Sequence, residues 1–244
     1  MKSIPTLLLV AVLSSSCNAQ FPKVLQDAAK QVNGKGGTGL TNADVVAGLK
    51  EALNKGAEHS VDLASVTDGF WKNDRLRLPF PPEAIKVKNT LNGLGMNAQV
   101  EKFELTMNRA AENAAKEAVP VFVNAIKGMT VADGFAILKG GDHAATNYLK
   151  EKTTTELTAK FRPIVENATK QVALTSYWTP LAGAYNKTSL FTGGQAVDPD
   201  LDAYVTQKAI DGLFLLVADE EQKIRKDPMA RTTDLLKRVF AGQE

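Results

Sequence analysis

The chain has 244 residues, of which 44% are hydrophobic, so it is long enough and apolar enough to form a packed core. Its 29 lysines and arginines nearly balance 27 aspartates and glutamates, and a formal charge of +2 gives no general attraction to nucleic acid or anionic membranes. The single cysteine, Cys17, excludes a disulfide within the chain. We therefore expect no nucleic-acid partner and a fold stabilised by its core alone.

The first residues have the plan of an export signal. Lys2 precedes the apolar residues 4–13, a run shorter than the roughly 20 residues that a membrane-spanning helix needs. A cut before Cys17 leaves that cysteine as a lipid-attachment site, whereas a cut after Ala19 removes it. Residues 1–19 therefore predict an exported protein of the periplasm or the cell envelope, with membrane contact only through a lipid anchor on Cys17.

Residues 20–40 are expected to form an N-terminal helix and a glycine-rich linker. Residues 34–39 read G-x-G-x-x-G, but a dinucleotide site needs a strand before this pattern, and the preceding KVLQDAAKQV has a helical pattern. A phosphate-binding loop needs a lysine near its end, where Leu40 stands. We interpret the stretch as a hinge.

Residues 41–244 predict a single, compact, all-α domain of about ten helices with no significant sheet. TNAD at residues 41–44 resembles a capping box before a long helix, and TVAD at 130–133 repeats the pattern. Pro120 is expected to kink a helix that covers residues 99–125. Further helices are expected over 82–94, 130–139, from 142, and over 155–172, 174–186, 200–226 and 229–240.

Two short stretches depart from the surface-helix pattern. RLRLP at residues 75–79 has the only strand-like alternation. AIDGLFLLVA at 209–218 is apolar nearly all round and predicts a central helix packed on several sides. After it, Glu221 and Arg225 have the spacing of a favourable i,i+4 pair, which we interpret as part of a solvated helix end.

Metal-binding patterns are incomplete. Three aspartates alternate in residues 198–202 as in the start of a calcium loop, but Ala203 replaces the required glycine, and acids at the start of a helix explain them better. His59 and His143 are the only histidines and have no partner histidine at helical spacing. The sequence therefore predicts no metal site and no cofactor.

Five segments together carry a family resemblance: TNADVVAGLKEAL, MNRAAENAA, ILKGGDHAATNYLKEKTT, YVTQKAIDGLFLLVADEE and IRKDP. They run in this order across roughly residues 40–240 and resemble the bacterial domain of unknown function 4197 family. The resemblance implies an exported, often lipoprotein-like, helical protein. It implies no assigned activity and no established catalytic residues.

Polar side chains of these segments form a candidate site. Its members are Asn108, Arg109 and Glu112 on one predicted helix, Tyr204, Gln207, Lys208 and Asp211 on another, and Asp142 and Thr146. If the two helices face each other, Arg109 or Lys208 neutralises Asp211, and the set forms a ligand cleft. The favoured alternative is an interhelical network that fixes packing, because buried charges are normally paired.

Aromatic residues suggest a second arrangement. Phe70, Trp71, Tyr177 and Trp178 are sufficient for an aromatic pocket, but aromatic side chains more commonly fill the interior or anchor loops. We favour the second interpretation.

Three function classes follow. The leading hypothesis is a non-enzymatic envelope protein that binds a protein partner or a small ligand. The sequence contains no complete catalytic set, which favours a binding protein over an enzyme. A hydrolase of envelope material is an alternative suggested by Glu112, Asp142 and Asp211. A carrier of an apolar ligand is the third and requires a large dry cavity.

Overall fold

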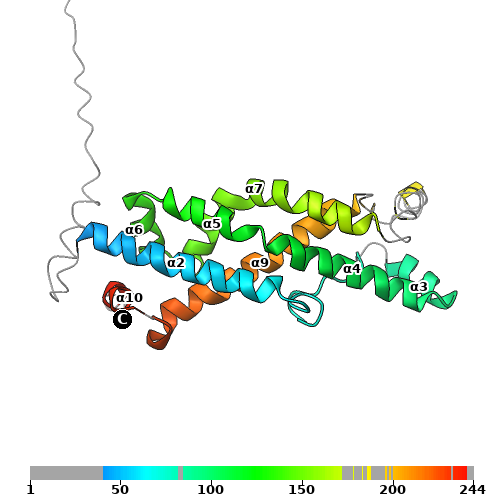
Figure 1. Cartoon of the computed structure of the whole chain (residues 1–244), viewed down its shortest axis with the longest axis horizontal. Coiled ribbons are helices and arrows are strands. Elements are labelled where there is room, and N and C mark those ends of the chain that lie inside the picture. Colours follow the sequence, from blue (N-terminus) through cyan, green and yellow to red (C-terminus); the bar gives the residue numbers. More distant parts are fainter. Residues whose placement is uncertain are drawn as a thin grey trace, which may run out of the picture. The chain divides into compact units, whose positions relative to one another are not determined.

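The computed structural model describes residues 41–81, 85–171, 178, 183, 186–187, 196, 198, 200–231 and 233–240. Within these residues the protein is all-α and has no strand (Figure 1). The helices are α2 (Asn42–Ser65), α3 (Ile85–Gly93), α4 (Asn97–Ala115), α5 (Ala118–Lys127), α6 (Val131–Lys139), α7 (Ala144–Thr169), α9 (Leu201–Lys226), the short 3₁₀ helix η2 (Pro228–Ala230) and α10 (Asp234–Phe240).

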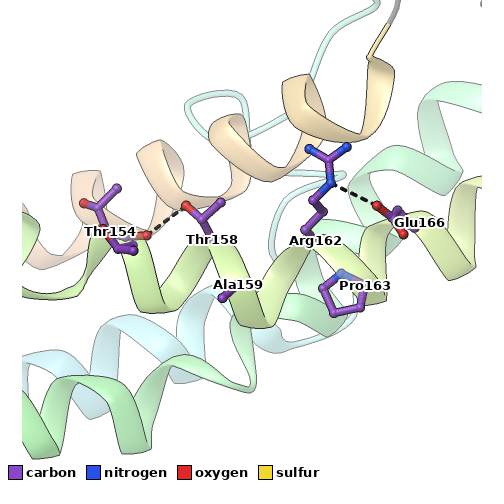
Figure 2. Close-up of a pocket in the computed structure, with 7 residues that line it drawn as sticks. Thr154, Thr158, Ala159, Arg162, Pro163 and Glu166 are labelled. Atoms are coloured by element: carbon purple, nitrogen blue, oxygen red, sulfur yellow. Dashed lines mark hydrogen bonds and ion pairs between the residues drawn. The ribbon is translucent and has the colours of Figure 1, made fainter.

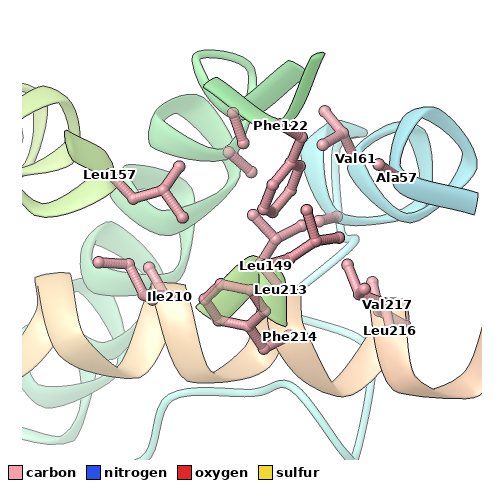
Figure 3. Close-up of a cluster of buried hydrophobic side chains, with 14 of the residues drawn as sticks. Ala57, Val61, Phe122, Leu149, Leu157, Ile210, Leu213, Phe214, Leu216 and Val217 are labelled. Atoms are coloured by element: carbon pink, nitrogen blue, oxygen red, sulfur yellow. The ribbon is translucent and has the colours of Figure 1, made fainter. Parts of the chain in front are cut away.

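Helix α9 is central to the domain, as its apolar sequence predicts. It packs against α2, α4 and α7, and Figure 1 shows these long helices running beside one another. Leu213 and Ile210 of α9 are fully buried, as are Leu149 and Leu157 of α7. Figure 3 shows these side chains together with aromatic residues from α5 and α9. The interior is therefore a filled apolar core shared by several helices.

The expected number of about ten helices is too high for the described residues. Residues 144–169 form the single helix α7, where two separate helices were expected. The threonine run does not interrupt it, and the hydroxyls of Thr153 and Thr154 are satisfied within the helix, each donating to the carbonyl four residues earlier at 2.6 Å. Residues 229–240 are also not one helix, since only η2 and α10 form there. The helix expected in 20–40 falls outside the described residues, and so does most of the one expected over 174–186.

Pro120 does not kink a continuous helix, which corrects the expectation for residues 99–125. Helix α4 ends at Ala115 and α5 begins at Ala118, so Pro120 lies in the first turn of α5. The missing N–H of a proline costs little in a first turn, because those N–H groups have no partner within the helix. The break provides the turn between the two helices.

Both predicted capping boxes are present. The Thr41 hydroxyl accepts from Asp44 N at the start of α2, and the Thr130 hydroxyl accepts from Asp133 N at the start of α6. Hydrogen bonds from the side chain and backbone of Thr130 hold the pKa of Asp133 below its ordinary value of 3.8. Hydrogen bonds from the backbone and side chain of Thr41 likewise lower the pKa of Asp44.

Acid is therefore expected to destabilise the domain through these caps. A carboxyl group whose pKa is lower in the folded state contributes its full stabilisation above the unfolded-state value, and this is lost as the pH falls through the lower folded-state pKa. We expect the urea midpoint to fall as the pH is lowered through and below 3.8, and to fall less in a Thr130→Val variant. Equal losses in the two proteins would contradict a contribution from the α6 cap.

One glycine of α9 allows a close contact with the segment that follows α2. A Cβ atom added to Gly212 would lie 2.8 Å from Phe70 Cε1, and the Phe70 ring is fully buried. We expect Gly212→Ala to lower the free energy of unfolding by about 1–3 kcal/mol in chemical denaturation, because the ring has no free space to move into. Gly93→Ala is the control, since an added Cβ there meets no atom within 4 Å. Equal stability of the two variants would contradict this packing.

Among the described residues, no single helix is long and apolar enough to cross a membrane, and one pair that passes the same test together is bent by 106°.

Candidate functional site

Helix α4 holds residues 66–81 against the domain through a buried carboxylate. Glu112 Oε1 accepts hydrogen bonds from the backbone N–H groups of Phe70 and Trp71, both at 3.1 Å. Its other oxygen accepts from Arg109 Nη1 at 2.7 Å, and the Glu112 side chain is only 4% exposed. A buried carboxylate needs such partners. Both oxygens of Glu112 are therefore used to hold residues 70–71 and Arg109.

Asn108 holds the same segment further along. Its side-chain oxygen accepts from Leu78 N at 2.8 Å, and its amide nitrogen donates to Leu78 O at 3.0 Å and to Glu104 O at 2.8 Å. Asn108 is fully buried. This amide satisfies both backbone groups of Leu78, so it fixes the end of the segment without a neighbouring strand.

Arg109 connects this cluster to an unusual backbone position. Its Nη2 atom lies 2.6 Å from Asp68 Oδ1, and Lys72 Nζ lies 2.7 Å from the other oxygen of Asp68. Hydrogen bonds from Lys72 and then Arg109 lower the pKa of Asp68. Asp68 has a φ of 71°, a left-handed conformation that costs energy for a residue other than glycine. The two cations thus hold the side chain of the residue that reverses the chain.

A second buried carboxylate caps the start of α7. Glu221 of α9 accepts from Ala145 N at 2.9 Å, from Thr146 N at 2.8 Å and from the Thr146 hydroxyl at 2.8 Å. The first N–H groups of a helix have no partner within it and favour a negative charge. Glu221 therefore caps α7 from another helix.

Arg225 extends this junction to the end of α6. Its Nη2 atom donates to Ile137 O at 2.8 Å, and its Nε atom donates to Glu221 at 2.9 Å. The side chains of Glu221 and Arg225 are 5% and 11% exposed. The i,i+4 pair predicted from the sequence is confirmed, but the interpretation as a solvated helix end is wrong, because both side chains lie inside the junction of α6, α7 and α9.

Asp142 lies outside this junction. It forms an ion pair with Lys226 at 2.8 Å, and the Lys226 ammonium lowers the pKa of Asp142. Both side chains are more than half exposed. His143 Nε2 lies 3.3 Å from Gln222 Nε2. Asp142 and His143 therefore belong to a surface contact beside the buried Glu221 cap.

The nine candidate residues do not converge on one cleft. Arg109 binds Asp68 and Glu112, so it does not neutralise Asp211 as expected. Asp211 accepts from the Gln207 amide at 2.9 Å, and Lys208 has no ion pair or hydrogen bond with the described residues. The set divides into an α4 group (Asn108, Arg109, Glu112), an α9 surface group (Tyr204, Gln207, Lys208, Asp211) and two residues near the start of α7 (Asp142, Thr146).

The α9 surface group borders an open groove of about 290 Å³. We call this the α9 groove; it lies between residues 75–79 and α9 and is lined by Arg75, Leu76, Arg77, Leu78, Pro79, Lys208, Asp211, Gly212 and Leu215. The Tyr204 hydroxyl lies beside it and donates to Pro79 O at 3.3 Å. Sequence reasoning identified both walls but not their contact, because they are more than a hundred residues apart.

Carboxylates hold the arginines of the α9 groove. Arg75 donates two hydrogen bonds to Asp219, at 2.7 and 3.1 Å. Arg77 donates to Glu104 at 3.3 Å, and its guanidinium carbon lies 4.1 Å from the centre of the Trp71 ring. Lys208 is exposed on the opposite wall. The arginines therefore have defined positions, while Lys208 makes no ion pair with a residue that the structure describes.

The α9 groove can be compared with two further hollows formed by described residues. One, of about 450 Å³, lies on the exposed face of α7 (Figure 2), where Arg162 binds Glu166 at 2.9 Å and Asp200 at 2.6 Å. Its lining comes from α7 alone. The other lies beside Glu221, Arg225 and Phe240 and has about 20 Å³, room for one water molecule. Neither brings free charged groups from several elements together.

The four aromatic residues do not form one pocket. Phe70 packs beside Gly212, while Trp71 stacks with Arg77. Trp178 lies 5.9 Å from Phe80 and 6.4 Å from Phe103, between ring centres, and is buried. These contacts confirm interior packing and loop anchoring for three of the residues, and Tyr177 lies outside the described residues.

The acids of residues 198–202 contribute to the start of α9. Asp200 is its N-cap and accepts from Ala203 N at 2.9 Å, while Asp202 accepts from the Thr169 hydroxyl at 2.7 Å. The helix-start interpretation is therefore confirmed for Asp200. In the part of the chain that the structure describes, no group of three or more His, Cys, Asp or Glu side chains is placed to hold a metal ion.

Comparison with known proteins identifies the family. Residues 39–241 match the family described as protein of unknown function (DUF4197), so the chain belongs to that family. No curated protein and no solved structure matches the chain. Family membership assigns no activity to the chain.

Proposed function

We propose that this member of the DUF4197 family is a non-enzymatic domain of the cell envelope that binds a protein partner or a small ligand at the α9 groove. One observation carries the proposal. The buried carboxylates Glu112 and Glu221 are occupied by backbone N–H groups and arginines, whereas the groove is open and its Lys208 has no partner among the described residues.

The hydrolase alternative lacks a convergent pair of acids. A paired acid and base must both lie within reach of one substrate. Glu112 binds Arg109 and the backbone of residues 70–71, Asp142 binds Lys226, and Asp211 binds Gln207. These three carboxylates belong to three separate groups of contacts, which favours binding over hydrolysis.

The carrier alternative needs an interior cavity of ligand size, typically a few hundred Å³ or more. The centre of the described domain is instead filled by apolar side chains from α5, α7 and α9 (Figure 3). The small cavity beside Phe240 holds about one water molecule. Binding at the surface is therefore the better-supported mode.

The envelope location is part of the proposal and rests on residues 1–19, which lie outside the described residues. Mass spectrometry of the mature amino terminus tests it. An acylated Cys17 supports a lipid anchor, a chain that starts at Gln20 supports secretion without one, and a mature chain that retains Met1 contradicts export.

A thermal-shift screen tests the binding function. We expect compounds among sugars, peptides and lipid headgroups to raise the melting temperature of the protein, and Lys208→Ala to weaken that shift. Lys150→Ala is the matched control, since Lys150 is an exposed lysine of α7 outside the groove. Turnover of envelope material that Asp211→Asn abolishes without unfolding the protein would overturn the proposal in favour of an enzyme.

A further inference from the structure

We propose that the α9 groove binds a free α-amino acid with an apolar side chain, and that it holds both charged groups of that ligand. This inference rests on the proposed function, because it names the class of ligand for the same groove. It follows from the charges of the groove that the protein leaves unpaired, from their spacing on α9 and from the apolar side chains beside them.

The first step is to separate the charges of the groove that are already paired. Arg75 forms an ion pair with a carboxylate of α9, and Arg77 forms one with a carboxylate of α4. The other charged side chains of the lining are Lys208 and Asp211, and neither has an ion pair within the described residues. The groove therefore presents one positive and one negative charge, which complement a zwitterion better than an anion or a cation.

The second step is the spacing of these two charges. Lys208 and Asp211 are exposed and lie three residues apart on α9, so their Cβ atoms are about 5–6 Å apart on one face. Asp211 Oδ1 accepts from the Gln207 amide at 2.9 Å, which leaves its other oxygen as an acceptor. An α-amino acid carries its ammonium and its carboxylate on the same carbon, and charge-assisted hydrogen bonds span about 2.7–2.9 Å. Lys208 can therefore bind the carboxylate while Asp211 binds the ammonium.

The third step is the apolar surface beside this pair. Leu215 lies one turn after Asp211 on α9 and is 37% exposed, which is unusual for a large hydrophobic side chain. The exposed Pro79 belongs to the opposite wall. An apolar side chain on the ligand would cover both and remove apolar surface from water. This favours amino acids such as leucine over glycine or the charged amino acids.

The fourth step is size. At about 290 Å³, the groove lies near the lower limit of small-ligand sites, roughly 300–1,000 Å³. A groove of this size suits a compact ligand. A single amino acid supplies two opposite charges and one apolar side chain within that volume.

The fifth step is that both walls are held by the protein itself. Asn108 binds both backbone groups of Leu78, and Gly212 allows the close approach of Phe70 to α9. Walls that are already in place lose little conformational entropy on binding. The groove can therefore bind a ligand that makes only a few contacts.

An NMR titration of the ¹⁵N-labelled full chain at constant ionic strength tests the inference. The probe is L-leucine. N-acetyl-L-leucine lacks the ammonium, L-leucinamide lacks the carboxylate, and glycerophosphoethanolamine carries the zwitterion of a lipid headgroup. We expect leucine to bind with a Kd on the order of 1 mM, because exposed ion pairs are weak, and each of the other three compounds to bind about threefold or more weakly.

Two variants then assign the roles of the charged groups. We expect Lys208→Met and Asp211→Asn each to weaken leucine binding about threefold or more, since each removes one ion pair with the ligand. Lys150→Met and Asp62→Asn are the matched controls, because both residues are exposed on other helices and lie outside the groove. Circular dichroism verifies that the helices of each variant remain folded.

The outcomes separate this inference from the proposed function. Tighter binding of N-acetyl-leucine, or of leucine to the Asp211→Asn variant, would reveal an anion site and overturn the inference. Tighter binding of glycerophosphoethanolamine would assign the groove to a lipid headgroup instead. If leucine does not bind but another compound gives a thermal shift that depends on Lys208, the inference fails and the proposed function stands. If no compound depends on Lys208, both fail.

Discussion

Replacing Glu221 with alanine is expected to lower the free energy of unfolding by about 3–5 kcal/mol, as the loss of one partner of a buried ion pair does. The variant leaves Arg225 buried without its carboxylate, and leaves the N–H groups of Ala145 and Thr146 without their acceptor. The start of α7 and the end of α6 both depend on this pair. Urea denaturation monitored by circular dichroism measures the change.

Two comparisons make this result specific to the junction. Glu151→Ala removes an exposed carboxylate whose side chain is 73% exposed, and is expected to change stability by less than about 0.5 kcal/mol. The double variant Glu221→Ala with Arg225→Ala is expected to lose less than the sum of the single losses, because neither charge is then buried alone. A loss below about 1 kcal/mol in Glu221→Ala would contradict the role of the cap.

Replacing Glu112 with alanine is expected to lower the free energy of unfolding by about 3 kcal/mol. The backbone N–H groups of Phe70 and Trp71 lose their acceptor, and Arg109 retains only Asp68. We also expect faster amide hydrogen exchange in residues 66–81, because Glu112 is one of the groups that hold this segment.

The isosteric variant Glu112→Gln distinguishes support of the fold from catalysis. Its amide oxygen can still accept from the backbone, so we expect a smaller loss of about 1–2 kcal/mol. A catalytic Glu112 would give a different pattern, in which Glu112→Gln abolishes turnover of a substrate while stability remains that of the wild type.

Local sequence patterns predicted much of the fold. Periodicity predicted α9 almost to the residue, and the two Thr–Asp capping boxes predicted the starts of α2 and α6. The exact limits of α7 and α10 depend on tertiary contacts. Glu221 of α9 caps the start of α7, and α10 packs on α2 beside Gly48. Such contacts between distant residues leave no local pattern.

The candidate site was predicted less completely. Arg109 and Glu112 do bind each other, and Asn108 holds the same segment separately. Their partners in residues 66–81 were not foreseen, because a loop backbone has no side-chain signature. The burial of Glu221 had a readable signal: it continues the four-residue steps of Leu213 and Val217, both buried. The opposing walls of the α9 groove were each singled out, but their proximity required the folded chain.

Buried polar residues hold loops and helix ends in this protein, and the binding of a ligand at the α9 groove is our proposal. An NMR titration of the ¹⁵N-labelled protein with a compound that raises its melting temperature tests this proposal most directly. The account predicts shifts in the amide signals of Arg75, Arg77, Lys208 and Gly212, with those of Ala145 and Thr146 unchanged. Shifts confined to Ala145 and Thr146, or the absence of any shift in the groove, would contradict it.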